Sequence, residues 1–493
     1  MSPLSADFTS GYRPDPRHTR LGDAFYDVVA PAAFPARVTR FRNQRWAERL
    51  GLGALSDEDW TRHFGAFEPL PENLTVPLAL RYHGHQFRSY NPNLGDGRGF
   101  LFAQLRDAEG RLLDLATKGS GQTPWSRAGD GRLTLKGGVR EALATEMLEA
   151  LGVNTSKTLS LIETGEALMR NDEPSPTRAA VLTRLSHSHV RIGTFQRLLA
   201  TDDKVNMRRL IDYSIETYWP EAAPAADPVA AFYRLTVEAV AKMAAQWFAA
   251  GFVHGVLNTD NTVITGESFD YGPWRFLPTL DPAFTAAYFD DTGLYAFGRQ
   301  PGAMAWNLAR LGECLLGFSS LAVIEAELSE FRPAFDAALT RQTCARLALP
   351  VADEAKAAAA SAAFYHALHE SKLPFERAFF DMTGGARPER LAASPHRADY
   401  EGAVWAGAVA VLRAAGSDAD LSAGYFQRAA PVTMLIEDVE AVWDPIARDD
   451  DWSRFEAAVA AVREMGAAYA PFSQVQSSTI LPLSPARMMS KPD

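Results

Sequence analysis

Cysteine is nearly absent from the sequence: Cys314 and Cys344 are the two thiols in 493 residues. Two cysteines can form one disulfide at most, which cannot stabilise a chain of this length, and their spacing is not that of a zinc site. Long apolar runs are missing as well. Residues 1–20 contain none that would serve as a signal peptide, and the most apolar stretch, Ala403–Leu412, is half the roughly 20 residues that span a bilayer. We therefore expect a protein of the reducing cytoplasm that makes no contact with a membrane.

Positive charge is in deficit. The chain has 49 Lys and Arg residues against 60 Asp and Glu, a formal net charge of -11. A nucleic-acid-binding protein normally shows a basic surface, so we expect no nucleic-acid partner. The content of 47% hydrophobic and 11% aromatic residues is that of a globular protein. If so acidic a chain binds a phosphate compound, its cations must be gathered in one place, and that guides the search for a site.

The apolar pattern divides the chain into three parts. Residues 1–80 mix short apolar patches with Pro and Gly, so we expect a loose arm over 1–20 and then irregular structure with one helix near Gln44–Leu50. Residues 81–200 contain short β-type runs. These runs are Gly99–Leu105, Leu112–Thr117, Thr158–Glu163 and Ala179–Leu185. Residues 201–493 are mostly helical, and we expect the tail after Pro471 to be partly mobile.

Two helices stand out by their period. Val139–Leu151 carries apolar residues one turn apart and is followed by Gly152, a plausible cap. A longer apolar stripe runs from Phe232 to Trp247 and ends at Gly251. The prediction is an α+β fold with the two lobes of a protein kinase, in which a β-rich N-lobe with one inserted helix (81–200) precedes a helical C-lobe (201–493). Residues 1–80 form an extension that packs on this core, and a second extension ends the chain. Many α+β proteins share this order, so the motifs must decide.

Three glycines alternate in Leu94-Gly95-Asp96-Gly97-Arg98-Gly99, directly before a predicted strand. Without Cβ atoms, the backbone at Gly95 and Gly97 can approach a phosphate, and Arg98 adds a cation. Taken alone, the motif is better explained as a tight hairpin turn, because Asp-Gly is a standard turn signal. Asp130-Gly131-Arg132 has the same two explanations, and there too the turn is the simpler one.

Four charged residues suit a nucleotide site. Lys118 ends an otherwise apolar strand, where a kinase places the lysine that contacts nucleotide phosphates, and Glu141 lies in the next helix, where a kinase places the glutamate that holds it. Arg184 interrupts the apolar run Val181–Leu185, and Arg191 follows seven residues later. A buried arginine needs an anionic partner, for which a triphosphate is well suited. A solvated lysine and ordinary salt bridges to Asp or Glu remain the alternatives.

The segment His254–Asn261, followed by Asp270-Tyr271-Gly272, matches the order of the kinase motifs His-Arg-Asp-Leu-x-x-x-Asn and Asp-Phe-Gly. The match places Asn261 and Asp270 at metal-binding positions, and their oxygens suit Mg²⁺ bound together with phosphates. Val256 then stands where a kinase has its base, and valine cannot accept a proton. Asp260 offers a carboxylate beside Asn261 that could act as the base, although a loop-capping role is the alternative.

Together these motifs resemble the selenoprotein O family, which are protein adenylyltransferases with a pseudokinase fold. The motifs are Tyr82–Phe87, Leu94–Gly99, Gly129–Arg132, Leu182–Arg184, His254–Asn261 and Asp270–Pro273. The resemblance runs from about Phe25 to about Pro301. It departs in the tail, because Val475-Gln476-Ser477-Ser478 lacks the selenocysteine or cysteine that some members carry there.

The resemblance implies that AMP, rather than phosphate, moves from ATP to Ser, Thr or Tyr hydroxyls of target proteins. It implies that ATP is bound in an inverted orientation by Gly95, Gly97, Arg98, Lys118, Asp130, Gly131, Arg184, Arg191 and Asp270. Glu141 would position Lys118, Asp260 would accept the proton, and Asn261 and Asp270 would bind Mg²⁺ or Mn²⁺. Two rival functions remain, a phosphotransferase with Asp260 as base and a catalytically silent ATP-binding scaffold. We expect a monomer.

Overall fold

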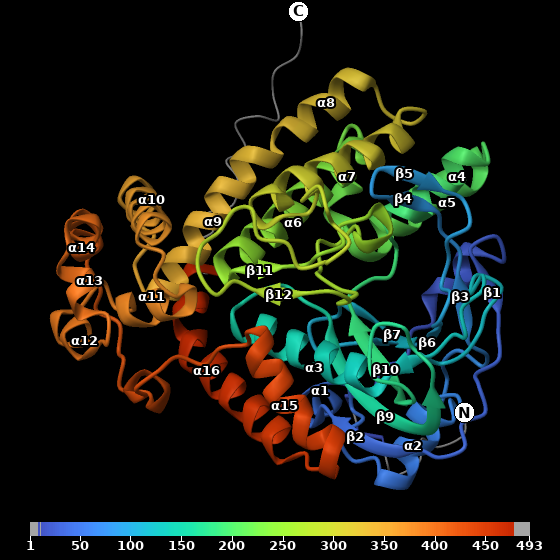
Figure 1. The fold of residues 1–493 in the computed structure, drawn as a ribbon. Coiled ribbons are helices and arrows are strands. Elements are labelled where there is room, and N and C mark those ends of the chain that lie inside the picture. The colour runs from blue at the N-terminus through green and yellow to red at the C-terminus, as the bar shows by residue number, and fades with distance from the viewer. Residues whose placement is uncertain (1–7, 10, 478–493) are drawn as a thin grey trace, which may run out of the picture.

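A computed structural model of the chain describes residues 8–9 and 11–477. Its centre is an antiparallel sheet in the order β1-β3-β6-β7-β10-β9-β2, with β8 beside β10 (Figure 1). The strands of this sheet are β1 (Tyr26–Val28), β2 (Val38–Arg42), β3 (Leu78–Leu80), β6 (Leu101–Arg106), β7 (Leu112–Lys118), β8 (Leu133–Thr134), β9 (Lys157–Leu168) and β10 (Thr177–Ser186). Two small hairpins pair β4 (Gly84–Gln86) with β5 (Ser89–Asn91), and β11 (Phe252–Val253) with β12 (Arg275–Phe276). This sheet and the surrounding helices confirm the α+β class.

The sheet is apolar on both faces, which explains why its strands could be found from the sequence. Alternate residues of a strand point to opposite faces. Leu161 and Leu182 accordingly belong to the core formed with the helices on one side, whereas Ile162 and Val181 belong to a second core on the other. The predicted runs over 99–105, 112–117, 158–163 and 179–185 are confirmed as β6, β7, β9 and β10.

The first 80 residues are more regular than the sequence indicated. The helix predicted near Gln44–Leu50 is confirmed as α1 (Gln44–Arg49), but α2 (Asp57–Gly65) was missed. Its residues Trp60 and Phe64 are fully buried against the sheet. The expectation of a loose arm is wrong for its described part, because the turn Arg17–Leu21 buries His18 and Leu21. Strands β1, β2 and β3 also come from this region, so it contributes directly to the central sheet.

Helix α3 (Leu135–Ala150) packs against β9 and β10 and carries Glu141 toward the sheet. It confirms the helix predicted over 139–151. The side chain of Thr134 caps its first turn by accepting a hydrogen bond from the backbone N–H of Gly137. Beyond its last residues, Gly152 has φ +78°, a conformation that few residues other than glycine adopt readily.

Helices dominate the chain after β10, as predicted. The stripe from Phe232 to Trp247 lies on α6 (Pro228–Ala250), which ends at Gly251 with φ +63° and packs against α7, α8 and α9. The other helices are α4 (Ile192–Ala200), α5 (Lys204–Tyr218), α7 (Gln300–Leu315), α8 (Leu321–Ser329), α9 (Phe331–Leu347), α10 (Glu354–Ser371), α11 (Phe375–Met382), α12 (Pro388–Ala393), α13 (Arg397–Glu401), α14 (Ala403–Ala415), α15 (Ile436–Asp449) and α16 (Ser453–Ser477).

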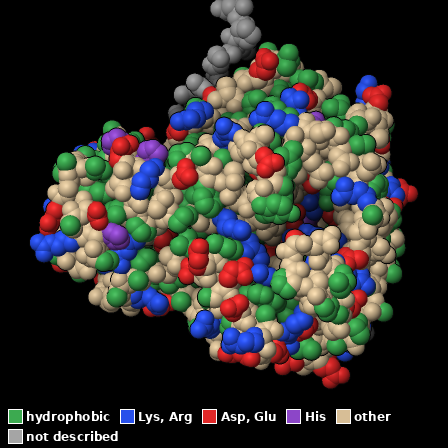
Figure 2. Space-filling model, in the orientation of Figure 1, with side chains coloured by type: hydrophobic (Ala, Val, Ile, Leu, Met, Phe, Trp, Pro, Cys, Tyr) green, Lys and Arg blue, Asp and Glu red, His purple; other side chains and the backbone are tan. Residues whose placement is uncertain are grey.

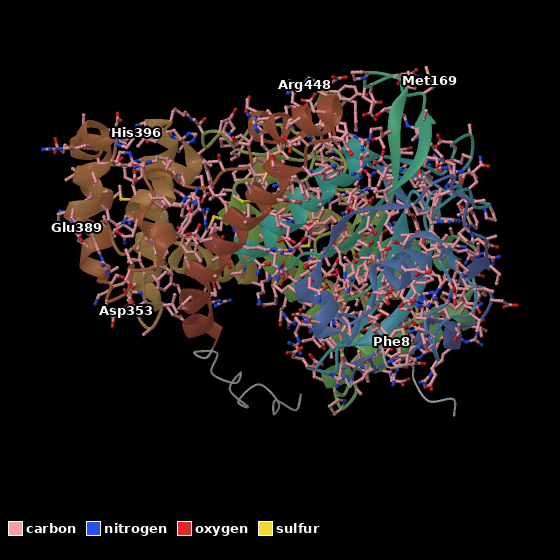
Figure 3. All side chains as sticks on the ribbon, turned by 90° about the horizontal axis from the view of Figure 1, so that it is seen from below. Phe8, Met169, Asp353, Glu389, His396 and Arg448 are labelled. Atoms are coloured by element: carbon pink, nitrogen blue, oxygen red, sulfur yellow. The ribbon has the colours of Figure 1, made fainter. Side chains whose placement is uncertain are left out.

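Helices α10 to α14 form a separate group with its own apolar core, which includes Phe364, Phe379 and Trp405. Figure 3 shows Glu389 and His396 of this group at the opposite end of the molecule from Met169, which follows β9. Helix α16 packs against α3 and continues past Pro471, so the start of the predicted mobile tail is helical. The rest of that tail lies outside the described residues. Within the described residues, we find no helix long and apolar enough to cross a membrane.

Candidate active site

A cavity of about 690 Å³ lies between the part of the sheet that contains β7 and β10 and the loop that follows β11. Figure 2 shows this face of the molecule hollowed, with basic side chains inside the hollow. The cavity brings together the predicted ligand-binding and metal-binding residues. They are Gly95, Gly97, Arg98, Lys118, Asp130, Gly131, Arg184, Arg191, Asp260, Asn261 and Asp270. Glu141 does not line the cavity, but lies buried behind Lys118.

Two cations and two carboxylates form a network at the inner wall. Lys118 Nζ lies 2.7 Å from Glu141 Oε2 and 3.1 Å from Asp270 Oδ1. Arg184 Nη2 lies 2.7 Å from Glu141 Oε1 and 3.0 Å from the same oxygen of Asp270. The register explains the arrangement, because Arg184 pairs with Ala116, two residues before Lys118, so both cations leave the same face of the sheet. Each cation therefore bridges a buried carboxylate and one that borders the cavity.

The network fixes the charge of its members. Burial alone would raise the pKa of Asp270, but Lys118 and Arg184 outweigh it and hold that pKa well below its ordinary value. Burial opposes ionisation of Glu141 in the same way, and the same two cations lower its pKa. Burial would lower the pKa of Arg184, but Glu141 and Asp270 raise it. All three side chains are therefore charged at neutral pH.

Arg191, the residue directly before α4, is a further buried cation at the cavity. Its Nη1 donates to the carbonyl of Asp260 at 2.9 Å, and its Nη2 lies 3.1 Å from Asp96 Oδ1. The guanidinium is sandwiched between two rings, with the ring centroids of Tyr82 and Phe269 at 4.3 and 4.9 Å. The side chain is thereby tied both to the glycine-rich loop and to the loop that carries Asp260.

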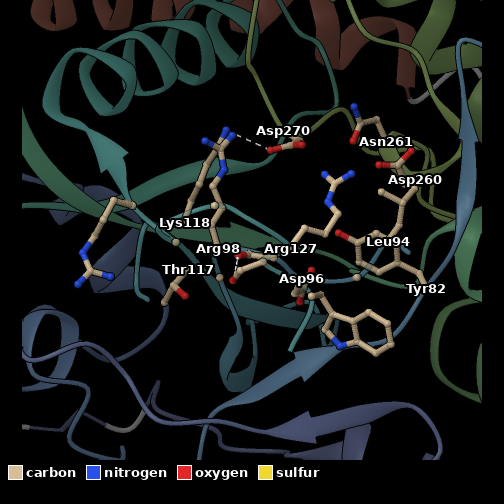
Figure 4. Close-up of a pocket in the computed structure, with 18 of the residues that line it drawn as sticks. Tyr82, Leu94, Asp96, Arg98, Thr117, Lys118, Arg127, Asp260, Asn261 and Asp270 are labelled. Atoms are coloured by element: carbon tan, nitrogen blue, oxygen red, sulfur yellow. Dashed lines mark hydrogen bonds and ion pairs between the residues drawn. The ribbon is translucent and has the colours of Figure 1, made fainter. Parts of the chain in front are cut away.

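The loop after β11 brings Asp260 and Asn261 to the cavity. His254 is buried, with Nε2 2.8 Å from the carbonyl oxygen of Phe269, so it links this loop to the residue before Asp270. Asp260 and Asn261 lie in a short turn, Thr259–Asn261. In Figure 4, Asn261 is seen between Asp260 and Asp270 along one edge of the cavity. The three polar side chains thus border the same space.

Asp260 is the least satisfied of these groups. Its Oδ1 is buried and makes no hydrogen bond in the described structure. Burial raises the pKa of its carboxyl to about 6, an effect that Arg191 opposes. Two backbone segments approach Asp260 closely. A Cβ added to Gly84 would lie 3.1 Å from Asp260 Oδ1, and one added to Gly193 would lie 3.6 Å from the Asp260 Cα.

The glycine-rich loop borders the cavity, and the structure supplies a packing reason for its glycines. A Cβ added to Gly95 would lie 2.4 Å from the ring of Trp125, and one added to Gly97 would lie 2.8 Å from the Trp125 carbonyl oxygen. Two loops therefore lie against each other here. Gly131 sits in the second of these loops, with φ +69°, and any Cβ there would meet Gly121. Arg98 is exposed at the cavity, and its charge helps to lower the pKa of Asp270.

Asp130 is mainly engaged with the protein itself. Its carboxylate pairs with Arg170 at 2.8 Å and accepts a hydrogen bond from the backbone N–H of Arg132. Burial alone would raise the pKa of Asp130, but these two partners outweigh it and lower that pKa. Its place at the rim of the cavity is as expected, and its contacts are those of a residue that shapes the loop.

Several cavity residues were not singled out from the sequence. The cavity is also lined by Tyr82, Trp125, Arg127, Arg170 and Asn258. Tyr82 and Asn258 belong to motifs that were recognised, so their positions beside candidate residues were a usable signal. Arg127 lies in the polar loop between Lys118 and α3. The sequence shows it five residues before Arg132, so it could have been considered together with that arginine. Arg170 follows β9 and gave no signal, because only folding brings it to Asp130.

The oxygen donors at this edge fit a hard divalent cation. Asn261 donates its Nδ2 to the carbonyl of Val256 at 3.1 Å, which orients its side-chain oxygen as the free acceptor. The contacts of Lys118 and Arg184 with Asp270 fall on Oδ1. Among the described residues, no group of three or more His, Cys, Asp and Glu side chains is arranged to hold a metal. The set therefore fits Mg²⁺ or Mn²⁺ that takes its remaining ligands from phosphates and water.

A polar cavity that holds several arginines and a lysine is suited to binding polyphosphates. Comparison with known proteins narrows this class. The profile of the family described as "Protein adenylyltransferase SelO" matches residues 10–463. The match extends well beyond Pro301, where the motif resemblance ended.

Relatives carry the same indication. "Protein nucleotidyltransferase YdiU" of Gloeobacter violaceus is 44% identical over 457 residues, which cover 90% of this chain and 93% of that protein. The proteins of the same name from Trichormus variabilis and Synechocystis sp. are 41% and 56% identical, over 92% and 60% of this chain and 96% and 62% of their own lengths. The chain belongs to the SelO protein adenylyltransferase family and is a nucleotidyltransferase.

Proposed function

We propose that this nucleotidyltransferase transfers AMP from ATP to a Ser, Thr or Tyr hydroxyl of a target protein and releases pyrophosphate. One observation carries the proposal, the difference between Val256 and Asp260. Both line the cavity, but valine occupies the position of the kinase base. Asp260 instead offers a buried oxygen without a partner and a pKa of about 6. Such a carboxylate is ionised at neutral pH and is still basic enough to take a proton.

The proposed reaction is a single displacement at the α-phosphorus. The acceptor oxygen bonds to phosphorus, the bond from that phosphorus to the oxygen bridging to the β-phosphate breaks, and the hydroxyl proton passes to Asp260. Negative charge then gathers on the departing pyrophosphate. Arg184, Arg191 and Lys118 border the same cavity and would stabilise that charge.

We propose Asn261 and Asp270 as the ligands of Mg²⁺ or Mn²⁺, which when bound neutralises phosphate charge. The supporting observation is the ion-pair network. Lys118 and Arg184 keep Asp270 ionised, so its carboxylate is ready to coordinate a cation throughout the physiological pH range. Glu141, 2.7 Å from Lys118, holds the lysine at the cavity wall as a positioning residue.

We also propose that the fold is that of a protein kinase, with 81–200 as the β-rich lobe, 201–493 as the helical lobe and 1–80 packed as an extension. The ion pair between the last residue of β7 and α3 supports this, since kinases join a strand lysine to a helix glutamate. The protein would act as a monomer in the cytoplasm, with ATP and hydroxyl-bearing proteins as its partners.

ATP labelled at either the α- or the γ-phosphate tests the proposal. The protein is incubated with Mg²⁺ or Mn²⁺, labelled ATP and a mixture of bacterial proteins, and protein-bound label is counted. The proposal predicts stable label from the α position and none from the γ position. Label from γ alone would identify a phosphotransferase. ATP binding without either transfer would identify a silent scaffold.

A further inference from the structure

Most of the exposed aromatic side chains in the described part of the chain lie together. Among the described residues, the Phe, Tyr and Trp side chains that are more than about a third exposed are Phe87, Tyr90, Tyr288 and Phe289. They belong to two segments that are 200 residues apart in the sequence. Tyr288 is 84% exposed, which is an extreme value for so large a ring. Exposed aromatic groups gathered in this way are typical of interaction surfaces.

Three of these rings form one surface. The ring centroids of Phe87 and Phe289 are 5.9 Å apart, and those of Tyr288 and Phe289 are 5.1 Å apart. Phe87 also packs on the buried ring of Tyr295 at 5.0 Å. We call Phe87, Tyr288 and Phe289 the aromatic patch. Tyr90 lies beside His83 and His85 instead.

The aromatic patch is joined to the cavity by hydrogen bonds. The backbone N–H of Phe87 donates to Asn258 Oδ1 at 3.0 Å, and the hydroxyl of Tyr295 donates to the same oxygen at 2.8 Å. Asn258 lines the cavity two residues before Asp260. Phe87 and Arg88 both have positive φ, +48° and +64°, an uncommon conformation that places this turn against the catalytic loop.

A hollow of about 600 Å³ lies in the same segment as Tyr288 and Phe289. Its lining comes from the stretch 282–299, which begins soon after Asp270. The three rings do not line this hollow, but Asp290 and Asp291, which follow Phe289 directly, do.

The charged side chains around the aromatic patch leave its rings uncovered. Arg88 lies over the ring of Trp306 at 5.5 Å. Both carboxylate oxygens of Asp290 accept backbone hydrogen bonds, from Leu294 and Tyr295. Arg299 donates to the carbonyl of Thr292 at 2.8 Å. Asp291 is exposed next to Asp290, so the patch offers a partner apolar ring surface with charge at its border.

We propose that the aromatic patch docks the target protein, by binding a large aliphatic side chain close in sequence to the hydroxyl that receives AMP. The inference rests on the proposed function, because it assumes a protein acceptor. The acceptor must reach Asp260, and the patch is bonded to the loop that carries Asp260. Contact with an aliphatic side chain removes exposed ring surface from water, and such contacts dominate the energetics of many interfaces.

The test uses short synthetic peptides that have one central Ser, Thr or Tyr in an alanine background. A leucine, or in a parallel set an aspartate, replaces each flanking alanine in turn. AMP transfer from α-labelled ATP is measured with the wild-type protein and with the double variant Tyr288→Ser, Phe289→Ser. Pyrophosphate release without peptide, in which water or a hydroxyl of the protein itself takes the AMP, is measured alongside. Tyr288→Phe keeps the ring, and Val404→Ser removes an exposed apolar side chain on distant α14.

The expected result is that leucine at one or more flanking positions raises kcat/KM about tenfold, which is typical of an interface anchor. The double variant should lose this preference while its pyrophosphate release stays unchanged, and both control variants should keep it. Three outcomes overturn the inference. They are equal rates for leucine and alanine peptides, a preference for aspartate, and a preference that survives in the double variant.

Two further outcomes separate this inference from the proposed function. If the wild-type protein releases pyrophosphate but labels no peptide, docking of a local segment is wrong while the nucleotide chemistry stands. If it neither binds nor cleaves ATP, the proposed function itself has failed. A second copy of this chain is the rival occupant. Sedimentation would then show a dimer that the double variant disrupts, and this result too would overturn the inference.

Discussion

Lys118 and Glu141 form a 2.7 Å ion pair in which both side chains are buried. Arg184 contacts the other carboxylate oxygen of Glu141 at 2.7 Å, so one glutamate contacts both cations of the network. Glu141→Gln keeps the shape but removes one of the two negative charges that balance them. Loss of one partner of a buried pair typically costs about 3–5 kcal/mol, and we expect a destabilisation of about 3 kcal/mol here. Urea unfolding measures it. Glu238→Gln, on a surface pair with Arg234, should change stability by less than about 0.5 kcal/mol.

Asp270 is predicted to be indispensable to the metal-dependent reaction. Asp270→Ala removes an oxygen ligand and leaves phosphate charge less neutralised, so kcat for AMP transfer should fall by about a thousandfold or more. The same loss should follow chelation of wild-type protein with EDTA and be reversed by Mg²⁺ or Mn²⁺. Asp449→Ala, at an exposed pair with Arg448, is the matched control. Near-normal turnover of Asp270→Ala would remove it from the metal site.

Replacing Asp260 by asparagine should make the folded protein more stable although it makes the enzyme less active. Its pKa in the folded protein, about 6, is above its ordinary value of 3.8, so the folded state favours the protonated form. Stability from this group is present below about pH 4 and is lost as the pH rises through 6. In EDTA, Asp260→Asn should therefore be about 2–3 kcal/mol more stable than wild type near pH 8, and little different near pH 4. Asp203→Asn, at an exposed helix cap, should show no such gain.

The same carboxylate sets the pH dependence of the reaction. Below about pH 6 Asp260 is protonated and cannot accept the hydroxyl proton, so the transfer rate should rise about tenfold per pH unit and then level above 6. Asp260→Asn should be slow at every pH and lack this rise. A rise that persists unchanged in the variant would assign the proton to another group.

Lys118 and Arg191 are predicted to act through ATP binding. Lys118→Ala and Arg191→Ala each remove a charge-assisted contact, worth about 1–3 kcal/mol, so kcat/KM for ATP should fall between about 5- and 150-fold. Arg332→Ala, on the surface of α9, is the control for loss of an arginine. Unchanged kinetics of both variants would exclude these residues from the site.

The sequence predicted the elements whose local pattern is strong. Strands β9 and β10 are long and apolar, and α6 repeats its apolar residues once per turn over most of its length, so both types were recognisable. Lys118 and Glu141 could be paired because they hold the positions of the kinase lysine and glutamate. Arg184 stood out because charge inside an apolar strand is costly unless it is paired. The structure brings all three into one network.

What the sequence could not predict depends on contacts between distant segments. Strands β1 and β3 have three residues each, too few to show a period, and their place in the sheet follows from pairing with each other and with β6. Gly95 was explained by phosphate binding or by a tight turn, because nothing local indicates that Trp125 packs against it. The raised pKa of Asp260 arises from burial, and segments that are far away in the sequence, such as those of Gly84 and Gly193, lie close to this residue.

We propose that nucleotide and divalent cation meet at Asn261 and Asp270, beside Lys118, Arg184 and Arg191. A crystal structure with Mn²⁺ and α,β-methylene ATP, which cannot release pyrophosphate, is the sharpest test of this proposal. We expect an anomalous Mn²⁺ peak coordinated by Asn261 Oδ1, an Asp270 oxygen and phosphate oxygens, with the α-phosphate nearest Asp260. Manganese bound elsewhere, or a γ-phosphate nearest Asp260, would contradict it.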